Sequence, residues 1–324
     1  MNFAAQNNVA FISRSRPAIS EHILVHFVSF CAARLKLQFK TIKAYLAGIR
    51  HFYIIDLGVN PMISRQGAPL ELLAITLRGI RKRQIVVKST RLPISREILT
   101  GMCTLLGQGI FEPYTSALAK AAATLAFFGL LRCGEFTSCD LSHEPALSIG
   151  DVSIFQEKTG AGISVNIRAS KTDPFRAGCV IKVCQTGGIA CPVEAMTQFL
   201  KHRAATFSQN NGPLFKQVDG RPLTRSAFVA IVRVILQRMG LNPDCYAGHS
   251  FRIGGATAAA EANIPDHLIK TLGRWSSDCY QTYIRTPLSL IREAQVKMAG
   301  QVPRMLSANS ARERTAHTPS RRQR

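Results

Sequence analysis

The sequence is poor in acidic residues and has no long apolar segment. Its 324 residues carry 41 Lys and Arg against 19 Asp and Glu, which gives a formal net charge of +22. No apolar run approaches the roughly 20 residues of a membrane-spanning helix. The stretch MNFAAQNNVAFISRSRP lacks the apolar core of a signal peptide. We therefore expect no membrane association, and the surplus of positive charge favours a polyanionic partner such as nucleic acid.

Motifs for nucleotide cofactors and metals are also missing. The chain has no P-loop, no H-E-x-x-H and no paired-glycine dinucleotide fingerprint. Its nine cysteines include no doubled C-x-x-C. Cys139 with His143, and Cys245 with His249, have the spacing of half a metal site, but neither pair has an obvious second half. We expect reduced cysteines in an intracellular protein, and a chemistry that uses no metal, no nucleotide and no other cofactor.

The first ninety residues show helical periodicity. Ser20 is a candidate N-cap for an apolar helix that includes residues 23–30. The segment TIKAYLAGIRHFYIIDLG predicts a second helix, closed by Gly58. Its expected buried stripe is Ile42, Tyr45, Leu46, Ile49, Phe52 and Tyr53. A third helix is expected from about Leu70. We interpret residues 1–88 as a helical, DNA-binding domain.

A run of basic residues without any acid follows the third helix, in LRGIRKRQIVVKSTRLP. A charge run is usually only a solvated face. This one lies where a linker would run, and its sign matches the global excess, so we interpret it as an interdomain strap that contacts phosphates. A nuclear address is the alternative. The predicted DNA-contacting residues are Lys40, Lys43, Arg50, Arg78, Arg81, Lys82, Arg83 and Lys88.

A second, larger unit begins near Leu92. Ser95 is a candidate N-cap, and SALAKAAATLAFFGLLRCGEF predicts an alanine-rich buried helix that ends near Gly129. Around SKTDPFRAG the apolar period changes to two, which predicts an antiparallel β-hairpin. Helical periodicity then returns. Residues 89–300 therefore read as a mostly helical domain with a small antiparallel β-sheet, in a mainly α protein. The basic stretch 301–324 has the composition of a disordered tail.

An ordered series of polar and aromatic residues runs through the second domain. Its members are Arg132 in GLLRCGEF, Lys171 in the hairpin, His249 and Arg252 in GHSFRIGGAT, and Trp275, Tyr280 and Tyr283 in LGRWSSDCYQTYIR. His249 and Arg252 lie one turn apart at the expected start of a helix, where free amide groups favour an anion. Each motif alone is a weak signal, because a capped helix or a core tryptophan would explain it. The ordered set indicates a shared functional site more strongly than any single motif does.

These residue types suit cleavage of a phosphodiester without ATP. A tyrosine oxygen can store the bond energy in a covalent intermediate, but its unperturbed pKa near 10 makes it a poor nucleophile at neutral pH. A cluster of Arg132, Arg252 and Lys171 would favour the phenolate and neutralise the transition state. Lysine suits the role of acid, since arginine effectively never loses its proton. Tyr280 and Tyr283 share one helix face, so either is a candidate nucleophile.

This series resembles that of the tyrosine recombinases, the phage-integrase family, over nearly the whole chain. The segments LRCGEFT, HSFRIGGAT and LGRWSSDCYQTYIR are similar to recombinases of eukaryotic DIRS-like, Ngaro-like and Crypton-like mobile elements. The roles implied by the resemblance are phosphate binding for Arg132 and Arg252, protonation of the leaving 5′ oxygen for Lys171, assistance of proton transfer for His249, and nucleophilic attack for Tyr283. Trp275 stands where most members have histidine. The step from Trp275 to Tyr283 is one residue shorter than the family's usual one.

The resemblance also implies the fold and the activity. It implies a SAM-like core-binding domain at 1–88 and a catalytic domain of the tyrosine-recombinase fold at 89–300, which together encircle duplex DNA. The implied enzyme is a site-specific DNA recombinase or integrase that works as a homotetramer on DNA, through a 3′-phosphotyrosyl intermediate, for integration or excision of a mobile element. A eukaryotic element would place it in the nucleus, and another host in the cytoplasm or nucleoid. The abrupt start of the first domain is compatible with a fragment or a worn copy.

Three alternatives remain open. The first is a catalytically inactive DNA-binding protein derived from such a recombinase. The second is a topoisomerase-like enzyme with the same tyrosine chemistry and no partner duplex. The third is a ribosome-associated basic protein, which would not need the ordered series of polar residues.

Overall fold

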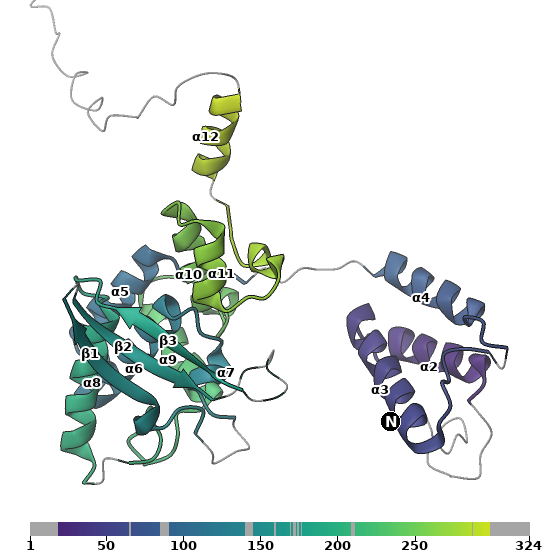
Figure 1. Ribbon diagram of the computed structural model, residues 1–324, viewed down its shortest axis with the longest axis horizontal. Helices are drawn as coiled ribbons and strands as arrows, with labels where there is room; N and C mark the ends of the chain where they lie inside the picture. Colours follow the sequence, from purple (N-terminus) through teal and green to yellow (C-terminus); the bar gives the residue numbers. More distant parts are fainter. Residues whose placement is uncertain are drawn as a thin grey trace, which may run out of the picture. The chain divides into compact units, whose positions relative to one another are not determined.

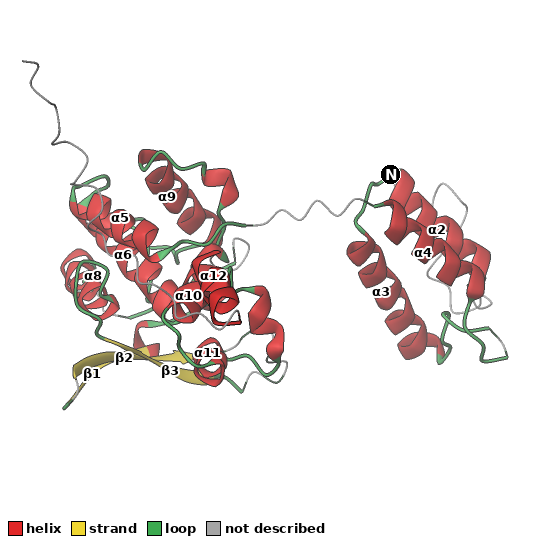
Figure 2. Cartoon of the chain, turned by 90° about the horizontal axis from the view of Figure 1, so that it is seen from above, coloured by secondary structure: helices red, strands yellow, loops and turns green. Residues whose placement is uncertain are grey.

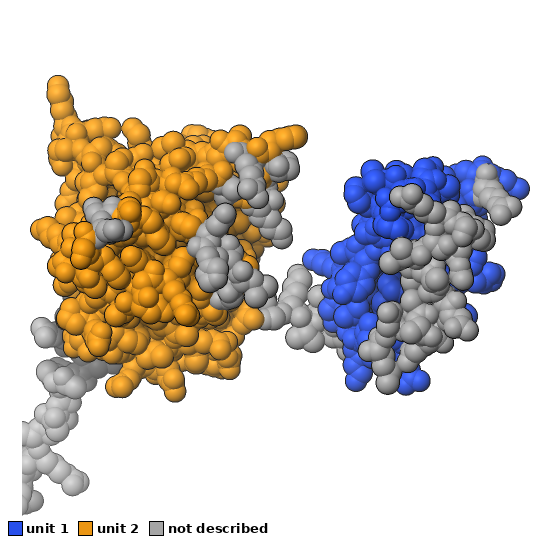
Figure 3. Space-filling model, turned by 90° about the horizontal axis from the view of Figure 1, so that it is seen from below, with its two compact units in different colours: residues 1–89 blue, residues 90–324 orange. Residues whose placement is uncertain are grey.

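The computed structural model divides the chain into two compact units, residues 1–89 and 90–324 (Figure 3). It describes residues 19–64, 66–84, 91–139, 145–158, 160–168, 170, 173, 175, 177–208, 211–286 and 288–298, with the side chains of 288–290 and 293 excepted. Two predicted functional residues, Lys88 and Lys171, lie outside the described residues, and so does the segment 301–324.

Unit 1 is a three-helix domain over its described residues. Its helices are α2 (Glu21–Ala33), α3 (Phe39–Leu57) and α4 (Glu71–Arg83) (Figure 1). The Ser20 side chain accepts a hydrogen bond from the Ile23 amide, which confirms the predicted N-cap, and Gly58 ends α3 in the left-handed conformation. The side chains at the centre of this domain are Leu24, Val28, Cys31, Ile42, Leu46 and Leu73.

The predicted buried stripe on α3 is wrong in part. Ile42, Leu46 and Tyr53 are buried, but Tyr45 and Phe52 are 48% and 39% exposed. In the described part of the chain α3 packs mainly against α2 and α4. These two neighbours cover a narrower sector of the helix than its apolar periodicity suggests. The exposed aromatic residues lie beyond that sector.

Unit 2 is mainly helical. Its α-helices are α5 (Arg96–Gly107), α6 (Pro113–Phe128), α7 (Cys133–Phe136), α8 (Pro192–Thr206), α9 (Arg225–Arg238), α10 (Ser250–Glu261), α11 (Asp266–Gly273) and α12 (Leu288–Met298). Short 3-10 turns lie at η1 (Ile149–Asp151), η2 (Pro243–Cys245) and η3 (Asp278–Thr282). The Ser95 side chain accepts from the Ile98 amide, as its prediction as an N-cap requires. No described helix combines the length and the apolar character needed to cross a membrane.

The three described strands form one antiparallel sheet in the order β1-β2-β3, at one side of unit 2 (Figure 2). They are β1 (Val152–Glu157), β2 (Gly160–Ile167) and β3 (Cys179–Cys184). Strands β2 and β3 are the predicted hairpin, with Val165 opposite Ile181. Strand β1 was not specifically predicted, because most of its side chains are solvent-exposed and its apolar alternation is short.

Helix α6 forms the centre of unit 2 and ends at Gly129, as the sequence predicts. It packs against α5, α8 and α10. Two glycines let α10 approach its neighbours closely. A Cβ atom at Gly254 would overlap the carbonyl of Ile94, just before α5, and one at Gly255 would overlap the carbonyl of Phe127 in α6. Gly255 therefore allows α10, which carries Arg252, to lie directly beside the end of α6.

Candidate active site

The turn after α6 provides main-chain acceptors for two arginines. Leu130 has a φ of +46°, in the left-handed region that non-glycine residues seldom adopt. Its carbonyl oxygen accepts hydrogen bonds from Arg252 Nη1 and, at 3.5 Å, from Arg274 Nη2. Arg274 Nη1 donates to the neighbouring carbonyl of Gly129 at 3.1 Å. The turn thus holds two cationic side chains side by side.

Arg132 follows this turn and is the N-cap residue of α7. Its Nη1 donates to Glu135 Oε1 at 2.9 Å, and its amide nitrogen donates to Glu135 Oε2 at 2.8 Å. Glu135 is 3% exposed and Arg132 is 14% exposed. Glu135 therefore orients Arg132 through both its side chain and its backbone, which is the contact expected from their i, i+3 spacing.

Arg252 is fully buried within the first turn of α10. Its Nη2 donates to the Gly273 carbonyl at 2.6 Å, in addition to the bond from Nη1 to Leu130. Burial, together with the positive charges of Arg132 and Arg274, lowers the pKa of Arg252 from 12.5 to about 10. Burial and the two neighbouring cations thus make the charged form of Arg252 less favourable than it is in water. An anion bound close by would offset this effect.

Trp275 lies against the guanidinium group of Arg252. The distance from Arg252 Cζ to the centre of the indole ring is 4.2 Å, within the range of a cation–π contact. The ring fits because residue 273 is glycine, since a Cβ there would overlap it. Two buried donors of this pair, Trp275 Nε1 and Arg252 Nε, have no hydrogen-bond partner among the described residues. The site therefore has unused donors to offer an acceptor.

The two tyrosines of the segment have different surroundings. Tyr283 is half-buried, and its ring lies 5.4 Å from Trp275 and 5.5 Å from Arg252 Cζ, measured to the ring centre. Tyr280 is buried and packs on Trp275 at a ring separation of 6.1 Å. A hydrogen bond with the carboxylate of Asp266 raises the pKa of Tyr280. Tyr283 is thus the tyrosine beside the arginines, whereas the hydrogen bond with Asp266 disfavours ionisation of Tyr280.

The tyrosines are fixed to α11 by charged contacts as well. Lys270 on α11 pairs with Asp278 at the start of η3, with 2.5 Å between Nζ and Oδ1. After η3, the Tyr283 carbonyl accepts from Thr257 Oγ1 at 3.5 Å, and the Arg285 amide donates to the same Thr257 oxygen at 3.1 Å. The segment is a short 3-10 turn rather than a regular helix. It therefore presents Tyr283 between α10 and α11.

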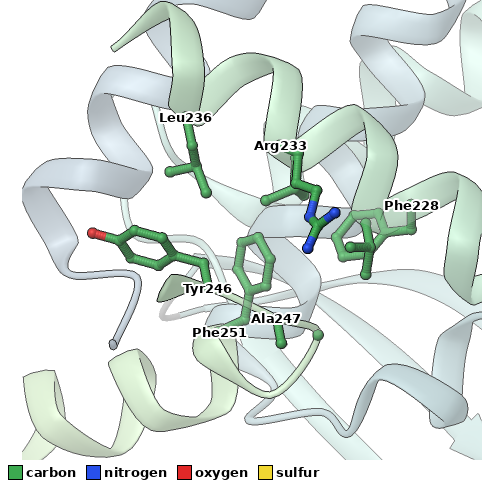
Figure 4. A pocket seen from close by; sticks show the side chains of 9 residues that line it. Phe228, Arg233, Leu236, Tyr246, Ala247 and Phe251 are labelled. Atoms are coloured by element: carbon green, nitrogen blue, oxygen red, sulfur yellow. The ribbon is translucent and has the colours of Figure 1, made fainter. Parts of the chain in front are cut away.

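His249 is the N-cap residue of α10, and its side chain is exposed. The loop before it is close to α7, because a Cβ at Gly248 would touch Cys133. Behind this loop, Phe228, Arg233 and Leu236 of α9 face Tyr246, Ala247 and Phe251 around a cavity of about 10 Å³ (Figure 4). That volume suffices for about one water molecule. This cavity is therefore too small for a substrate.

The structure brings together four of the six predicted catalytic residues, namely Arg132, Arg252, Trp275 and Tyr283. His249 is an exposed residue at the start of the helix that carries Arg252, and Lys171 is outside the described residues. Arg274 was not predicted. Its place in the LGRW motif, between Gly273 and Trp275, could have indicated a role in the site. Spacing alone does not show in which direction an arginine side chain extends.

Most predicted DNA-contacting residues gather at one end of unit 1. Gln84, just after α4, donates to the Leu37 carbonyl at 2.7 Å and accepts from the Phe39 amide at 2.6 Å, so the end of α4 lies beside the start of α3. Arg81 also lies over the Phe39 ring at 5.8 Å. The exposed basic residues brought to this end are Lys40, Lys43, Arg78, Arg81, Lys82 and Arg83. Arg50 is exposed too, but about 15 Å further along α3 from Lys40.

Among the described residues, no group of three or more His, Cys, Asp or Glu side chains lies together as a metal site would require. This holds for the surroundings of Cys245 and His249, whereas His143 lies outside the described part of the chain.

Comparison with known proteins finds similarity at the level of structure. No protein-family model and no curated protein sequence matches the chain. A post-cleavage complex of XerH site-specific recombinase with a palindromic difH substrate matches with a TM-score of 0.58 and 16% identity, over 87% of this chain and 70% of that one. The Tn1549 transposon integrase in complex with transposon right end DNA matches with a TM-score of 0.53 and 14% identity, over 88% of each chain. The protein therefore adopts the tyrosine-recombinase fold.

Proposed function

We propose that the protein is a site-specific DNA recombinase or integrase that cleaves and rejoins strands through a 3′-phosphotyrosyl intermediate at Tyr283. One observation carries the proposal: the half-buried Tyr283 ring lies 5.5 Å from the guanidinium carbon of a fully buried arginine. That arginine in turn lies within the field of two more. A phenol in this position lies beside the cations that would bind the phosphate it attacks.

The arginines of the site carry a surplus of positive charge that a bound anion would neutralise. Arg132, Arg252 and Arg274 face the single carboxylate of Glu135, so the cluster carries two uncompensated positive charges. A phosphodiester and a phenolate would bring two negative charges. The unused donors of Trp275 and Arg252 would then gain acceptors, and the charged form of the buried Arg252 would become more favourable.

The proposed step is an in-line exchange of esters. The Tyr283 hydroxyl releases its proton to solvent, its oxygen forms a bond to phosphorus, and the bond from phosphorus to the 5′ oxygen of the next nucleotide breaks. The 5′ oxygen leaves as a hydroxyl, with a proton that the resemblance assigns to Lys171, assisted by His249. The reverse attack by a 5′ hydroxyl restores a phosphodiester and frees the tyrosine. Number and kind of bonds are conserved, so no ATP is consumed.

The alternative nucleophile, Tyr280, is less suited to this step. Its hydroxyl is bonded to the Asp266 carboxylate, and this bond raises its pKa, which disfavours the phenolate. Its ring is packed beneath Trp275 rather than beside Arg252. We therefore assign Tyr280 to the support of Trp275 and of η3.

Duplex DNA is the proposed substrate. The XerH and Tn1549 structures of the same fold are complexes with DNA, and the exposed basic end of unit 1 suits phosphate contacts. Exchange of strands between two duplexes needs four cleavages, which four copies of the chain would supply. We therefore infer a tetramer on DNA, acting in integration or excision of a mobile element, and in the nucleus if that element is eukaryotic.

The test is formation of a covalent protein–DNA adduct. The full chain is incubated with a library of duplexes that have a randomised centre and nicks at staggered positions, so that a short 5′-hydroxyl fragment diffuses away after cleavage. Adducts that survive detergent are recovered and sequenced. We expect an adduct with the native protein, none with Tyr283→Phe, and an adduct again with the matched variant Tyr280→Phe.

Each other outcome favours one of the alternative functions or the alternative nucleophile. Salt-sensitive DNA binding without an adduct favours the inactive DNA-binding protein and contradicts the proposal. An adduct that relaxes supercoiled plasmid but never joins two duplexes favours the topoisomerase-like enzyme. Loss of the adduct in Tyr280→Phe but not in Tyr283→Phe contradicts the assignment of the nucleophile.

A further inference from the structure

Glu135 lies between two arginines, and each of its oxygens accepts a hydrogen bond from one of the two guanidinium groups. Its Oε1 is 2.9 Å from Arg132 Nη1, and its Oε2 is 2.8 Å from Arg274 Nη2. All three side chains are largely buried, with exposures of 3% for the carboxylate, 14% for Arg132 and 15% for Arg274. Attraction and repulsion between these groups are therefore weakly screened by solvent.

The two arginines differ in how many donors remain free. Nε and Nη2 of Arg132 make no hydrogen bond to the described part of the chain, so they are available to an anion. Arg274 is bound more completely, since its Nη atoms donate to the carbonyls of Gly129, Leu130 and Leu272 as well as to Glu135. Arg132 is thus placed to bind a ligand, and Arg274 is placed to act on Glu135.

The backbone at Arg274 is unusual for a residue with a side chain. Arg274 ends α11 with a φ of +56°, at a position where helices ordinarily have glycine or asparagine. A non-glycine residue in this region costs on the order of 1 kcal/mol. The same left-handed turn directs the side chain from α11 across to Glu135 and to the turn after α6. An arginine at this position is therefore held where it neutralises the carboxylate.

We propose that Arg274 is a positioning residue that compensates the charge of Glu135, so that Glu135 can orient Arg132 without cancelling the positive charge that Arg132 offers to the phosphate. With Arg274 present, the group of two arginines and one carboxylate has a net charge of +1. Without it, Arg132 and Glu135 neutralise each other. The inference rests on the proposed function, because it assigns a part in the same strand cleavage.

Arg274 and its sequence neighbour Trp275 have different partners. The indole of Trp275 packs on Arg252, and the guanidinium group of Arg274 binds Glu135.

The test is a charge-compensated double variant. Single-turnover rates of adduct formation are measured with saturating nicked DNA that the native protein cleaves. Arg274→Gln is expected to slow the step about a hundredfold, the size typical for loss of one electrostatic contribution to a transition state. The double variant Glu135→Gln with Arg274→Gln restores the net charge of the cluster and is expected to recover to within about tenfold of the native rate.

A purely structural role for Arg274 gives a different result, because the double variant would then be as slow as Arg274→Gln or slower. That outcome overturns the inference, and so does an unchanged rate in Arg274→Gln. If Arg274→Gln does not fold, Arg274→Lys replaces it. Retention of the charge predicts a rate within about tenfold of native, and a hundredfold loss contradicts the inference.

A matched control uses the exposed pair of Arg221 and Asp219, whose charges lie 3.9 Å apart in the same unit. Neither the single variant Arg221→Gln nor the double variant with Asp219→Asn is expected to change the rate. Failure of the inference is distinguishable from failure of the proposed function. In the first case native protein forms the adduct and only the variants depart from expectation, and in the second the native protein forms none.

Discussion

Positive charge is placed differently in the two units. In unit 1, residues such as Arg81, Lys82 and Arg83 are exposed at the end of a helix, and the only acids in residues 1–89 are Glu21, Asp56 and Glu71. In unit 2, the arginines of the site are buried around one carboxylate. Exposed charges act over about 8 Å at physiological salt and weakly, whereas buried charges act several times more strongly at short range. The exposed charges of unit 1 therefore suit weak contacts with many phosphates of a duplex. The buried arginines of unit 2 suit strong contacts with a single phosphate.

This contrast predicts that the buried arginine Arg252 governs chemistry and not affinity. Arg252→Lys keeps the charge but loses the planar fork that bonds to Leu130 and Gly273 and stacks on Trp275. We expect adduct formation about a thousandfold slower, with an unchanged salt dependence of DNA binding. A normal rate with a reduced salt slope would place Arg252 in the same class as the exposed residues.

The next largest expected effect concerns stability. Glu135→Ala would leave Arg132 and Arg274 buried without their carboxylate, and should lower the free energy of unfolding of unit 2 by about 3 kcal/mol. Urea unfolding measures this change. The control is Asp219→Ala, which removes an exposed partner of Arg221 and should cost less than about 1 kcal/mol. Equal losses in both variants would mean that burial of the site has no energetic consequence.

The exposed residues should show the opposite behaviour. Arg81→Ala with Lys82→Ala should reduce the salt slope of DNA binding by about two and the affinity at 0.15 M salt roughly thirtyfold. The rate of adduct formation from saturated complex should not change. Lys201→Ala, an exposed lysine on α8, is the control for loss of charge alone. A slower chemical step in the double variant would contradict the claim that the exposed residues of unit 1 affect only DNA affinity.

The smallest expected effect is at the ion pair that links α11 to η3. Lys270 and Asp278 are 35% and 71% exposed, so Asp278→Asn should lower stability by less than about 1 kcal/mol, and less still in 1 M salt. Thermal unfolding at two salt concentrations measures it. A loss comparable to that of Glu135→Ala would show that an exposed pair in unit 2 is as strong as a buried one.

Much of the fold could be predicted from local patterns. Apolar periodicity marks the helices, Ser20 and Ser95 cap them, and alternation marks β2 and β3. These features depend on residues close in sequence. Strand β1 was missed because its exposed faces weaken the alternation. Tyr45 and Phe52 were placed in the core because a helical pattern does not tell how many neighbours cover the helix.

The candidate site could be predicted only in part, because some of its contacts join residues that are far apart in the sequence. The order of Arg132, Arg252 and Tyr283 along the chain indicated a shared pocket, but only packing shows that Arg274 bridges to Glu135, 139 residues away. The resemblance predicts Tyr283 as the nucleophile, but residue spacing alone does not separate it from Tyr280. Tyr280 and Tyr283 are equivalent by spacing, and the Asp266 partner that distinguishes them lies on another helix.

The central claim is that the phenol beside the buried arginine becomes the covalent link to DNA. The most direct measurement is mass spectrometry of the trapped adduct, after protease and nuclease digestion, to find the residue that carries the nucleotide phosphate. A phosphate on Tyr283 is the expected result. A phosphate on Tyr280 or on any other residue would contradict the claim.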